Sequence, residues 1–266
     1  EIKEIRRRIK AQLEVFVHGA MCISYSGRCL LSNYMTGRDA NRGECAQPCR
    51  WNYALVEEKR PGRYYPIDED ERGSYIFNSQ DLCLLPHLPA LIDAGIDSFK
   101  IEGRMKSIHY VATVVQAYRK ALDSYYRDPE GYVFDPSWLK EITKVSHRDY
   151  TAGFLFGKPG SEAHNYDSSS YRRFYDFVGL VLGYDPQTGW ATVEQRNNFK
   201  RGDELEFTGP DTPIFTQILD EMTDEEGRPV DTAPHPRQVI RLPVAKPVKP
   251  WDLIRRAKNE RDEDEK

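Results

Sequence analysis

The sequence lacks the features that would assign it to several common classes. No apolar run approaches the roughly 18 residues of a membrane-spanning helix, and no apolar segment follows a basic start as in a secretory signal peptide. The patterns H-E-x-x-H, G-x-S-x-G, G-x-G-x-x-G and the P-loop are absent as well. We therefore expect a cytoplasmic protein without membrane contact. The missing patterns argue against a zinc protease of the H-E-x-x-H class, a serine hydrolase with a G-x-S-x-G nucleophile elbow, and a nucleotide-binding protein with a P-loop or a G-x-G-x-x-G loop.

An excess of positive charge is also missing. The 266 residues carry 38 Lys and Arg against 42 Asp and Glu, a net charge of -4, which argues against a protein that binds nucleic acid over its whole surface and leaves only a local basic face. Ile2, Ile5 and Ile9 lie at helical spacing directly after Glu1. This pattern predicts that the sequence opens inside an amphipathic helix of a longer protein.

Cysteine is scarce and clustered. Four of the five cysteines, Cys22, Cys29, Cys45 and Cys49, fall within 28 residues at spacings C-x6-C, C-x15-C and C-x3-C. Disulfides suit small secreted chains, and a structural zinc site usually has paired C-x2-C-like knuckles, whereas an iron–sulfur cluster tolerates irregular loops. Iron–sulfur, zinc and free thiols stay open from the spacing alone. Cys83 lies in an apolar run and is predicted to be a core thiol.

Strand and helix patterns alternate over the first 130 residues or so. This alternation predicts an α/β fold, the C-terminal part of a TIM-like (β/α)8 barrel, because a complete barrel needs about 250 residues. The predicted elements are a strand at 14–19, a strand at 75–77 followed by helical turns, a helix at 89–95, a strand at 97–103 and a long helix with apolar Val111, Val114, Val115, Tyr118, Leu122 and Tyr125.

The pattern changes after the long helix. Short strands separated by turn signals predict a small all-β barrel, at 177–182, 190–193, 204–207, 214–219 and 238–242. We expect residues 1–145 to form the partial barrel with its Cys-rich loop, 146–174 a connector, 175–250 the small β-barrel and 251–266 a charged tail. Arg201-Gly202-Asp203 is interpreted as a turn before a strand rather than as an adhesion motif.

Polar residues follow the predicted strands, at the edge where βα barrels place their active sites. We predict catalytic roles for His18 and Glu102, and substrate binding, to a carboxylate or phosphate, by Arg28, Arg50, Asn78, Lys100 and Arg104. Each has a structural alternative. Lys100 and Glu102 would form an ion pair in a barrel interior, His18 would be a satisfied core histidine, and the arginines would cover surface.

The stretch from Glu14 to Ser32, EVFVHGAMCISYSGRCLLS, resembles the signature of the collagenase-like peptidases of unknown catalytic type, family U32. The stretches GECAQPC, NSQDLC, FKIEGRMKS and SHRDYTAGFLFG are similar to further blocks of that family. The region from Phe177 resembles the small barrel appended to family members, itself similar to the second domain of elongation factor Tu.

The resemblance implies a function that the residues alone do not supply. Members were named as proteases that degrade collagen, whereas bacterial members similar in pattern take part in prephenate-dependent 5-hydroxylation of the tRNA wobble uridine. Those relatives carry an iron–sulfur cluster, expected here as 4Fe-4S, on cysteines that match Cys22, Cys29, Cys45 and Cys49. The expected partners are tRNA, prephenate or a similar small carboxylate, and a second subunit of the same family.

Two alternatives accompany this expectation. One is a collagenase-like peptidase, although the residues reveal no activated nucleophile and no hydrolytic metal site. The other is an RNA-docking or assembly module without catalysis of its own.

Overall fold

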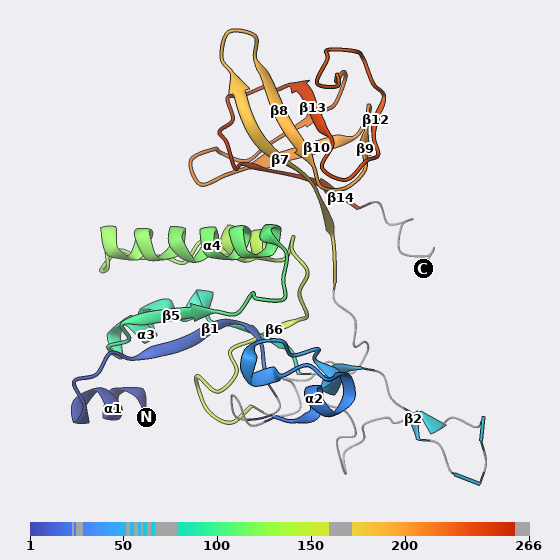
Figure 1. Ribbon diagram of the computed structural model, residues 1–266. Helices are drawn as coiled ribbons and strands as arrows, with labels where there is room; N and C mark the ends of the chain where they lie inside the picture. The colour runs from blue at the N-terminus through green and yellow to red at the C-terminus, as the bar shows by residue number, and fades with distance from the viewer. Residues whose placement is uncertain are drawn as a thin grey trace. The chain divides into compact units, whose positions relative to one another are not determined.

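Two compact units make up the chain (Figure 1). The structure, a computed structural model, describes residues 1–22, 24, 29–51, 54–55, 58–59, 61–62, 65–66, 79–159 and 172–258. Unit 1 comprises 1–142 and 146–172, and unit 2 comprises 143–145 and 173–266. Within the residues described, no helix has the length and apolar character needed to cross a membrane.

Unit 1 combines a small mixed sheet with short helices and one long helix. Its elements are α1 (Ile2–Arg8), β1 (Glu14–Ala20), α2 (Leu31–Thr36), η1 (Ala40–Arg42), η2 (Pro48–Arg50), β2 (Ala54–Leu55), β3 (Tyr65–Pro66), β4 (Asp81–Cys83), η3 (Leu85–His87), α3 (Leu88–Asp93), β5 (Ser98–Ile101), α4 (Ile108–Arg127), α5 (Pro136–Ile142) and β6 (Tyr150–Thr151). The α/β class is confirmed, as are the predicted opening helix, the strands at 14–19 and 97–103, and both later helices. The strand predicted at 75–77 lies outside the described residues.

The main sheet of unit 1 has the strand order β5-β1-β4-β6. β1 and β5 are parallel, as βα units require, and β4 is parallel to β6, but β4 runs antiparallel to β1 with His18 opposite Cys83. A TIM barrel has parallel strands throughout, so the four described strands do not show one. The sequence predicts helical turns where β4 forms, because a short apolar run fits a buried strand and a buried helix equally well.

The helix α4 lies over one face of this sheet (Figure 1). Ser107 caps it by accepting a hydrogen bond from the Tyr110 backbone N–H at 3.2 Å. Tyr110, Val114 and Tyr118 are buried against the sheet, whereas Val111 and Val115 are 39% and 45% exposed. The buried face is therefore narrower than the predicted apolar face.

Unit 2 is an all-β half-barrel. Its elements are β7 (Tyr175–Asp185), β8 (Trp190–Gln195), β9 (Phe199–Lys200), β10 (Glu204–Thr208), β11 (Phe215–Ile218), β12 (Thr232–Ala233), β13 (Val239–Pro243) and β14 (Leu253–Ala257). The order β11-β10-β14-β7-β8-β13 is antiparallel at every pairing. Val181, Val193, Leu205, Phe207 and Ile240 form part of its core. All five predicted strands are confirmed.

Two predicted domain boundaries differ from the structure. The charged tail expected from 251 instead begins with β14, which pairs with β10 and β7 in the middle of the sheet; consecutive arginines at 255 and 256 hide its strand pattern. The expected connector at 146–174 belongs largely to unit 1, because β6 pairs with β4 and His147 forms a bridge with Arg172.

The buried charge of β14 has local partners. Arg255 is fully buried, and its guanidinium binds the carboxylate of Glu206 on β10. Lys144 Nζ lies 3.0 Å from both oxygens of the same carboxylate. Because Glu206 compensates two cations, its charge holds the 143–145 segment and β14 to β10.

Replacing Glu206→Gln is expected to lower the free energy of unfolding of unit 2 by about 3–5 kcal/mol, since it neutralises the carboxylate that the buried Arg255 guanidinium and Lys144 bind. Asp211→Asn is the matched control, because it removes the exposed ion pair with Lys249 and should cost less than about 1 kcal/mol. Urea denaturation of both variants checks this. Equal losses would contradict a structural role for the buried charge.

Candidate functional site

The four clustered cysteines lie in residues 22–51, which we call the cysteine segment. Cys22 is exposed and Cys29, Cys45 and Cys49 are partly exposed, and none of these four forms a disulfide. The buried Ser32 hydroxyl accepts the Ala46 backbone N–H at 3.0 Å, which ties α2 to the strand-free stretch that carries Cys45. α2 also contacts η2, which contains Cys49. Local packing thus brings α2, which follows Cys29, against the parts of the segment that carry Cys45 and Cys49.

Two of the thiols accept backbone hydrogen bonds. Ser24 N–H points to Cys22 Sγ at 3.5 Å, and Gln47 N–H points to Cys45 Sγ at 3.3 Å. Gln47 has a φ of 56°, a left-handed conformation that turns its N–H back toward the sulfur. N–H···S bonds of this kind are common at cysteines that ligate metals, where they orient the sulfur and adjust the reduction potential of the bound metal group.

Across the described part of the chain, no three His, Cys, Asp or Glu side chains are grouped so that they could hold one metal ion. Iron–sulfur and zinc therefore both remain predictions.

A second loop packs against the cysteine segment. It runs from β5 to α4 and contains Glu102 and Arg104. Gly19, at the end of β1, has a φ of 126°, and a Cβ there would lie 2.8 Å from Glu102 Cβ. Gly43 has a φ of 76°, and the guanidinium end of the Arg104 side chain lies over it. The close approach of the Glu102 backbone requires glycine at position 19, and the positive φ favours glycine at both positions.

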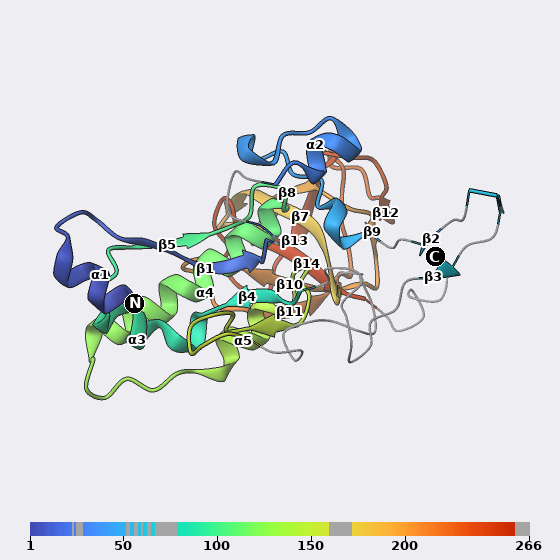
Figure 2. The ribbon, with the colours of Figure 1, turned by 90° about the horizontal axis from the view of Figure 1, so that it is seen from below.

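These contacts place Arg104 beside the cysteine segment, and Glu102 has hydrogen-bond partners of its own. The Glu102 carboxylate accepts a hydrogen bond from the Arg104 backbone N–H at 2.9 Å, and the Glu102 backbone N–H donates to His18 O at 2.9 Å. Figure 2 shows β1 and β5 running side by side toward the end of the sheet where α2 lies, with α1 and α3 at the opposite end. The predicted edge of the sheet therefore brings together Glu102, Arg104 and the cysteine segment.

Lys100 lies elsewhere. Its Nζ is 4.0 Å from Glu14 Oε1 and 4.8 Å from the centre of the Phe16 ring, on the exposed side of the sheet. The predicted pairing of Lys100 with Glu102 is therefore wrong, since each has another partner. Arg28 and Asn78 lie outside the described residues, as does the side chain of Arg50. Their predicted roles stay predictions.

His18 is buried in a cage of tyrosine rings, formed by Tyr110, Tyr118 and Tyr150 at 5.3–5.9 Å between ring centres. Tyr118 donates to Val17 O at 2.7 Å and lies 3.5 Å from His18 Nδ1. The sequence places His18 on the face of Glu14, but a register shift between Phe16 and His18 turns it to the buried side. Burial lowers the pKa of His18 to about 4, with the nearby Asp81 carboxylate opposing the shift.

A buried ion pair completes this cluster. Asp81 accepts the Arg148 backbone N–H at 3.1 Å, and the two charged groups approach to 3.9 Å. His147 stacks on Tyr150 with ring centres 5.0 Å apart. Sequence reasoning did not assign His147, Arg148 or Tyr150 to the site. All three lie in the stretch SHRDYTAG, and its run of polar and aromatic residues without helical or strand periodicity is the signal that could have identified them.

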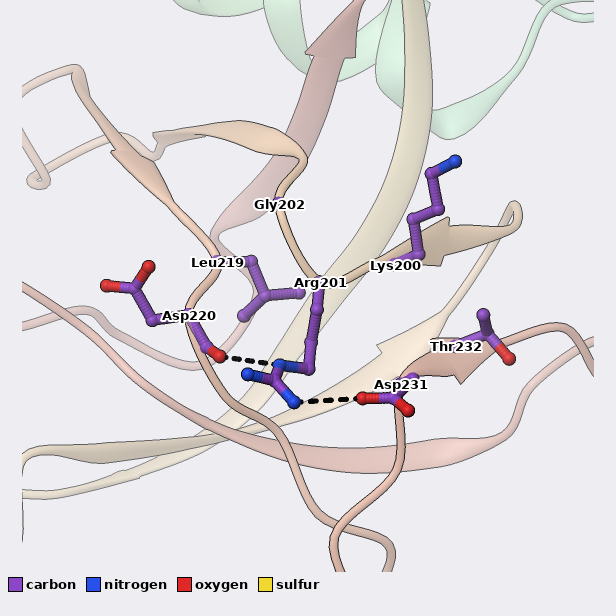
Figure 3. A pocket seen from close by; sticks show the side chains of 7 residues that line it. All are labelled: Lys200, Arg201, Gly202, Leu219, Asp220, Asp231 and Thr232. Carbon is purple, nitrogen blue, oxygen red and sulfur yellow. Dashed lines mark hydrogen bonds and ion pairs between the residues drawn. The ribbon is translucent and has the colours of Figure 1, made fainter.

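Unit 2 has a separate depression of about 490 Å³, lined by Lys200, Arg201, Gly202, Leu219, Asp220, Asp231 and Thr232 (Figure 3). Arg201 is held from two sides, because it donates to Asp220 O at 2.7 Å and to Asp231 Oδ1 at 3.0 Å. Its charge is compensated within the wall. Gly202, with a φ of 86°, makes the turn into β10, which confirms the predicted turn at Arg201-Gly202-Asp203.

The pKa of His18 predicts a pH dependence of stability. Its folded-state pKa is lowered from 6.5 to about 4, so between these values the unfolded chain binds a proton that the folded chain does not. As the pH falls through this window, stability should decrease by about 3 kcal/mol from this residue. An NMR titration of the His18 imidazole should give a midpoint near 4, and a midpoint near 6.5 would show that the ring is not desolvated.

Comparison with known proteins finds relatives that match most of the chain. The chain is 45% identical over 258 residues to tRNA hydroxylation protein P1 of Bacillus subtilis (strain 168), covering 97% of this chain and 61% of that protein. It is 37% identical to tRNA hydroxylation protein P of Escherichia coli (strain K12), covering 92% and 62%, and 33% identical to a collagenase of Porphyromonas gingivalis (strain ATCC BAA-308 / W83), covering 92% and 58%. The chain thus spans about three fifths of the length of these relatives.

Two family descriptions match successive parts of the chain. Residues 1–165 match Peptidase family U32, and residues 173–255 match the Peptidase family U32 C-terminal domain. The division at 165–173 agrees with the division between the two structural units. The chain belongs to peptidase family U32.

Proposed function

We propose that this protein takes part in the 5-hydroxylation of the wobble uridine of tRNA. The observation that carries the proposal is its similarity, over 97% of its length, to a protein named for tRNA hydroxylation. Prephenate, or a similar small carboxylate, is the proposed second substrate. Because this chain spans about three fifths of these relatives, the complete reaction is proposed for a protein of the relatives' full length.

The cysteine segment is the proposed cofactor site. Cys22, Cys29, Cys45 and Cys49 form no disulfide and are at least partly exposed, and thiols on irregular loops suit a 4Fe-4S cluster, whose irons lie apart from one another. The two N–H···S bonds fix the positions of the Cys22 and Cys45 sulfurs, as hydrogen bonds to ligating groups do at metal sites. When bound, such a cluster supplies one-electron transfer.

Arg104 is the proposed anchor for the carboxylate substrate. Its guanidinium packs over Gly43 in the cysteine segment, and its backbone is held by the Glu102 carboxylate. An arginine fixed in this way binds a carboxylate through two parallel hydrogen bonds. In this proposal Glu102 positions the loop, and the neutral imidazole of His18 supports the end of β1 from within.

A peptidase is the alternative, on the strength of the collagenase-named relative. It requires cleavage of a peptide bond by the protein alone, and it gives the four cysteines no role.

Nucleoside mass spectrometry of tRNA tests the proposal. In cells whose own copy carries Cys45→Ala, 5-hydroxyuridine at the wobble position should fall at least tenfold, because one proposed ligand is lost. Cys83→Ala is the matched control, since Cys83 is a buried core thiol on β4, and it should leave the modification near the wild-type level. Unchanged 5-hydroxyuridine in Cys45→Ala, together with peptide cleavage by the purified protein, would favour the peptidase.

A further inference from the structure

Three residues interrupt unit 1. The chain belongs to unit 1 up to Ile142 and again from Ser146, whereas Thr143–Val145, which we call the strap, belong to unit 2. Val145 is 1% exposed, so the strap is held by packing and not only by its connections to the chain on either side. The backbone on both sides of the strap is therefore tied to an element of the other unit.

Both ends of the strap are fixed within unit 1. The Tyr150 hydroxyl donates to Ile142 O at 3.1 Å, immediately before the strap. Lys106 Nζ donates to Ser146 O at 3.3 Å, immediately after it. Three residues extend over about 10 Å at most, so the fixed ends leave the strap few alternative positions.

Lys144 holds the middle of the strap within unit 2. Its Nζ lies 3.0 Å from both carboxylate oxygens of Glu206, and the two side chains are only 18% and 10% exposed. The same Nζ lies 5.2 Å from the centre of the Tyr175 ring. Breaking an ion pair that is mostly removed from water costs far more than breaking an exposed pair. The strap is therefore held most strongly by this one side chain.

The residues that follow the strap support the edge of the sheet where the site is proposed. The Arg148 backbone N–H donates to the Asp81 carboxylate at 3.1 Å, at the start of β4. The Tyr150 ring packs on His18 of β1, with ring centres 5.3 Å apart. Lys106, which binds the end of the strap, belongs to the β5–α4 loop that carries the proposed carboxylate anchor. Residues 146–150 thus contact both strand ends and this loop.

We propose that Lys144 is a positioning residue of the proposed site. By holding the strap to Glu206, it fixes the backbone of residues 146–148, and through this backbone the contacts with Asp81 and with the β5–α4 loop. Its ammonium binds Glu206 rather than a substrate. The inference rests on the proposed function, and it adds to that function a role for unit 2 in arranging the site of unit 1.

A role confined to unit 2 is the alternative. In that case Lys144 would stabilise unit 2 alone, and residues 146–148 would keep their positions without it, because His147 also forms backbone hydrogen bonds with Arg172 in unit 1. The two roles differ in what happens to unit 1 when the ammonium is removed. A measurement that reads residues 146–148 separately from unit 2 decides between them.

Amide hydrogen exchange of the full chain carrying Lys144→Met is that measurement. Methionine removes the charge and keeps an apolar side chain, and Glu206 keeps Arg255 as its counter-charge. The backbone amides of His147 and Arg148 should exchange at least about tenfold faster, since exchange reports the opening of local segments. The amides of α4 should exchange as in the wild type.

Three further variants control this measurement. Lys144→Arg keeps the cation and should stay within about twofold of the wild-type exchange rates, because a guanidinium also binds a carboxylate. Lys249→Met removes an exposed ion pair with Asp211 in unit 2 and should change nothing at residues 146–148. Two glycines inserted between Val145 and Ser146 leave the Lys144 ion pair intact but lengthen the strap. This insertion should accelerate the same amides, and it decides the question if Lys144→Met does not fold.

The imidazole of His18 and the tRNA product give two further readouts. The pKa of His18, about 4 when the ring is buried, should rise toward 6.5 in Lys144→Met, because a loosened backbone at 146–148 lets water reach the ring. In cells whose own copy carries Lys144→Met, 5-hydroxyuridine in tRNA should fall several-fold, since small displacements of positioned groups slow a reaction. Stabilisation of unit 2 alone would move neither value.

The outcomes distinguish this inference from the proposed function. If Lys144→Met leaves the exchange of residues 146–148 and the pKa of His18 as in the wild type, the inference is overturned and the tRNA function stands. If both change but 5-hydroxyuridine stays at the wild-type level, the positioning role is overturned. If both change and cells with the wild-type copy contain no 5-hydroxyuridine, the proposed function is contradicted while the coupling through the strap is upheld.

Discussion

The close approach of β1 to the loop after β5 is the constraint on which the site depends. Gly19 leaves no room for a side chain beside Glu102, and the guanidinium of Arg104 lies over Gly43. Together these contacts fix the cysteine segment against the β5–α4 loop, so that thiols from one part of the sequence and an arginine some sixty residues later share one edge of the sheet. A side chain at Gly19 would push β1 and the β5–α4 loop apart, because both the space and the positive φ exclude it, and at Gly43 the positive φ disfavours a side chain.

The interior beneath this edge is polar and closed. His18, Asp81, Arg148 and three tyrosines lie under the strand ends, where hydrogen bonds, an ion pair and ring contacts join them. Such a network fixes the positions of its side chains more than it adds to the free energy of unfolding. The attraction between buried charges does little more than offset the cost of removing them from water. It supports the end of β1, from which the cysteine segment departs. Unit 2 uses the same principle independently, with Glu206 compensating Arg255 and Lys144.

Much of the fold follows from periodicity, and the exceptions have physical causes. The strands of unit 2 alternate clearly, so all five were predictable, whereas β14 was hidden because its Arg255 is buried with a counter-charge that only the folded sheet brings near. β4 is too short and too apolar to distinguish from a helix. In the site, Glu102 and Arg104 were predictable from their place after a strand. Lys100 was not, since its partner Glu14 comes from the neighbouring strand, and the Asp81–Arg148 pair joins residues that no local pattern connects.

The central claim is that the four cysteines of this segment hold an iron–sulfur cluster beside Arg104. X-ray absorption at the iron edge of anaerobically purified protein tests it most directly. The account predicts iron surrounded by sulfur alone, with iron–iron scattering beyond, and loss of both signals in Cys45→Ala but not in Cys83→Ala. Protein that contains zinc in place of iron, or iron bound by nitrogen and oxygen, would contradict it.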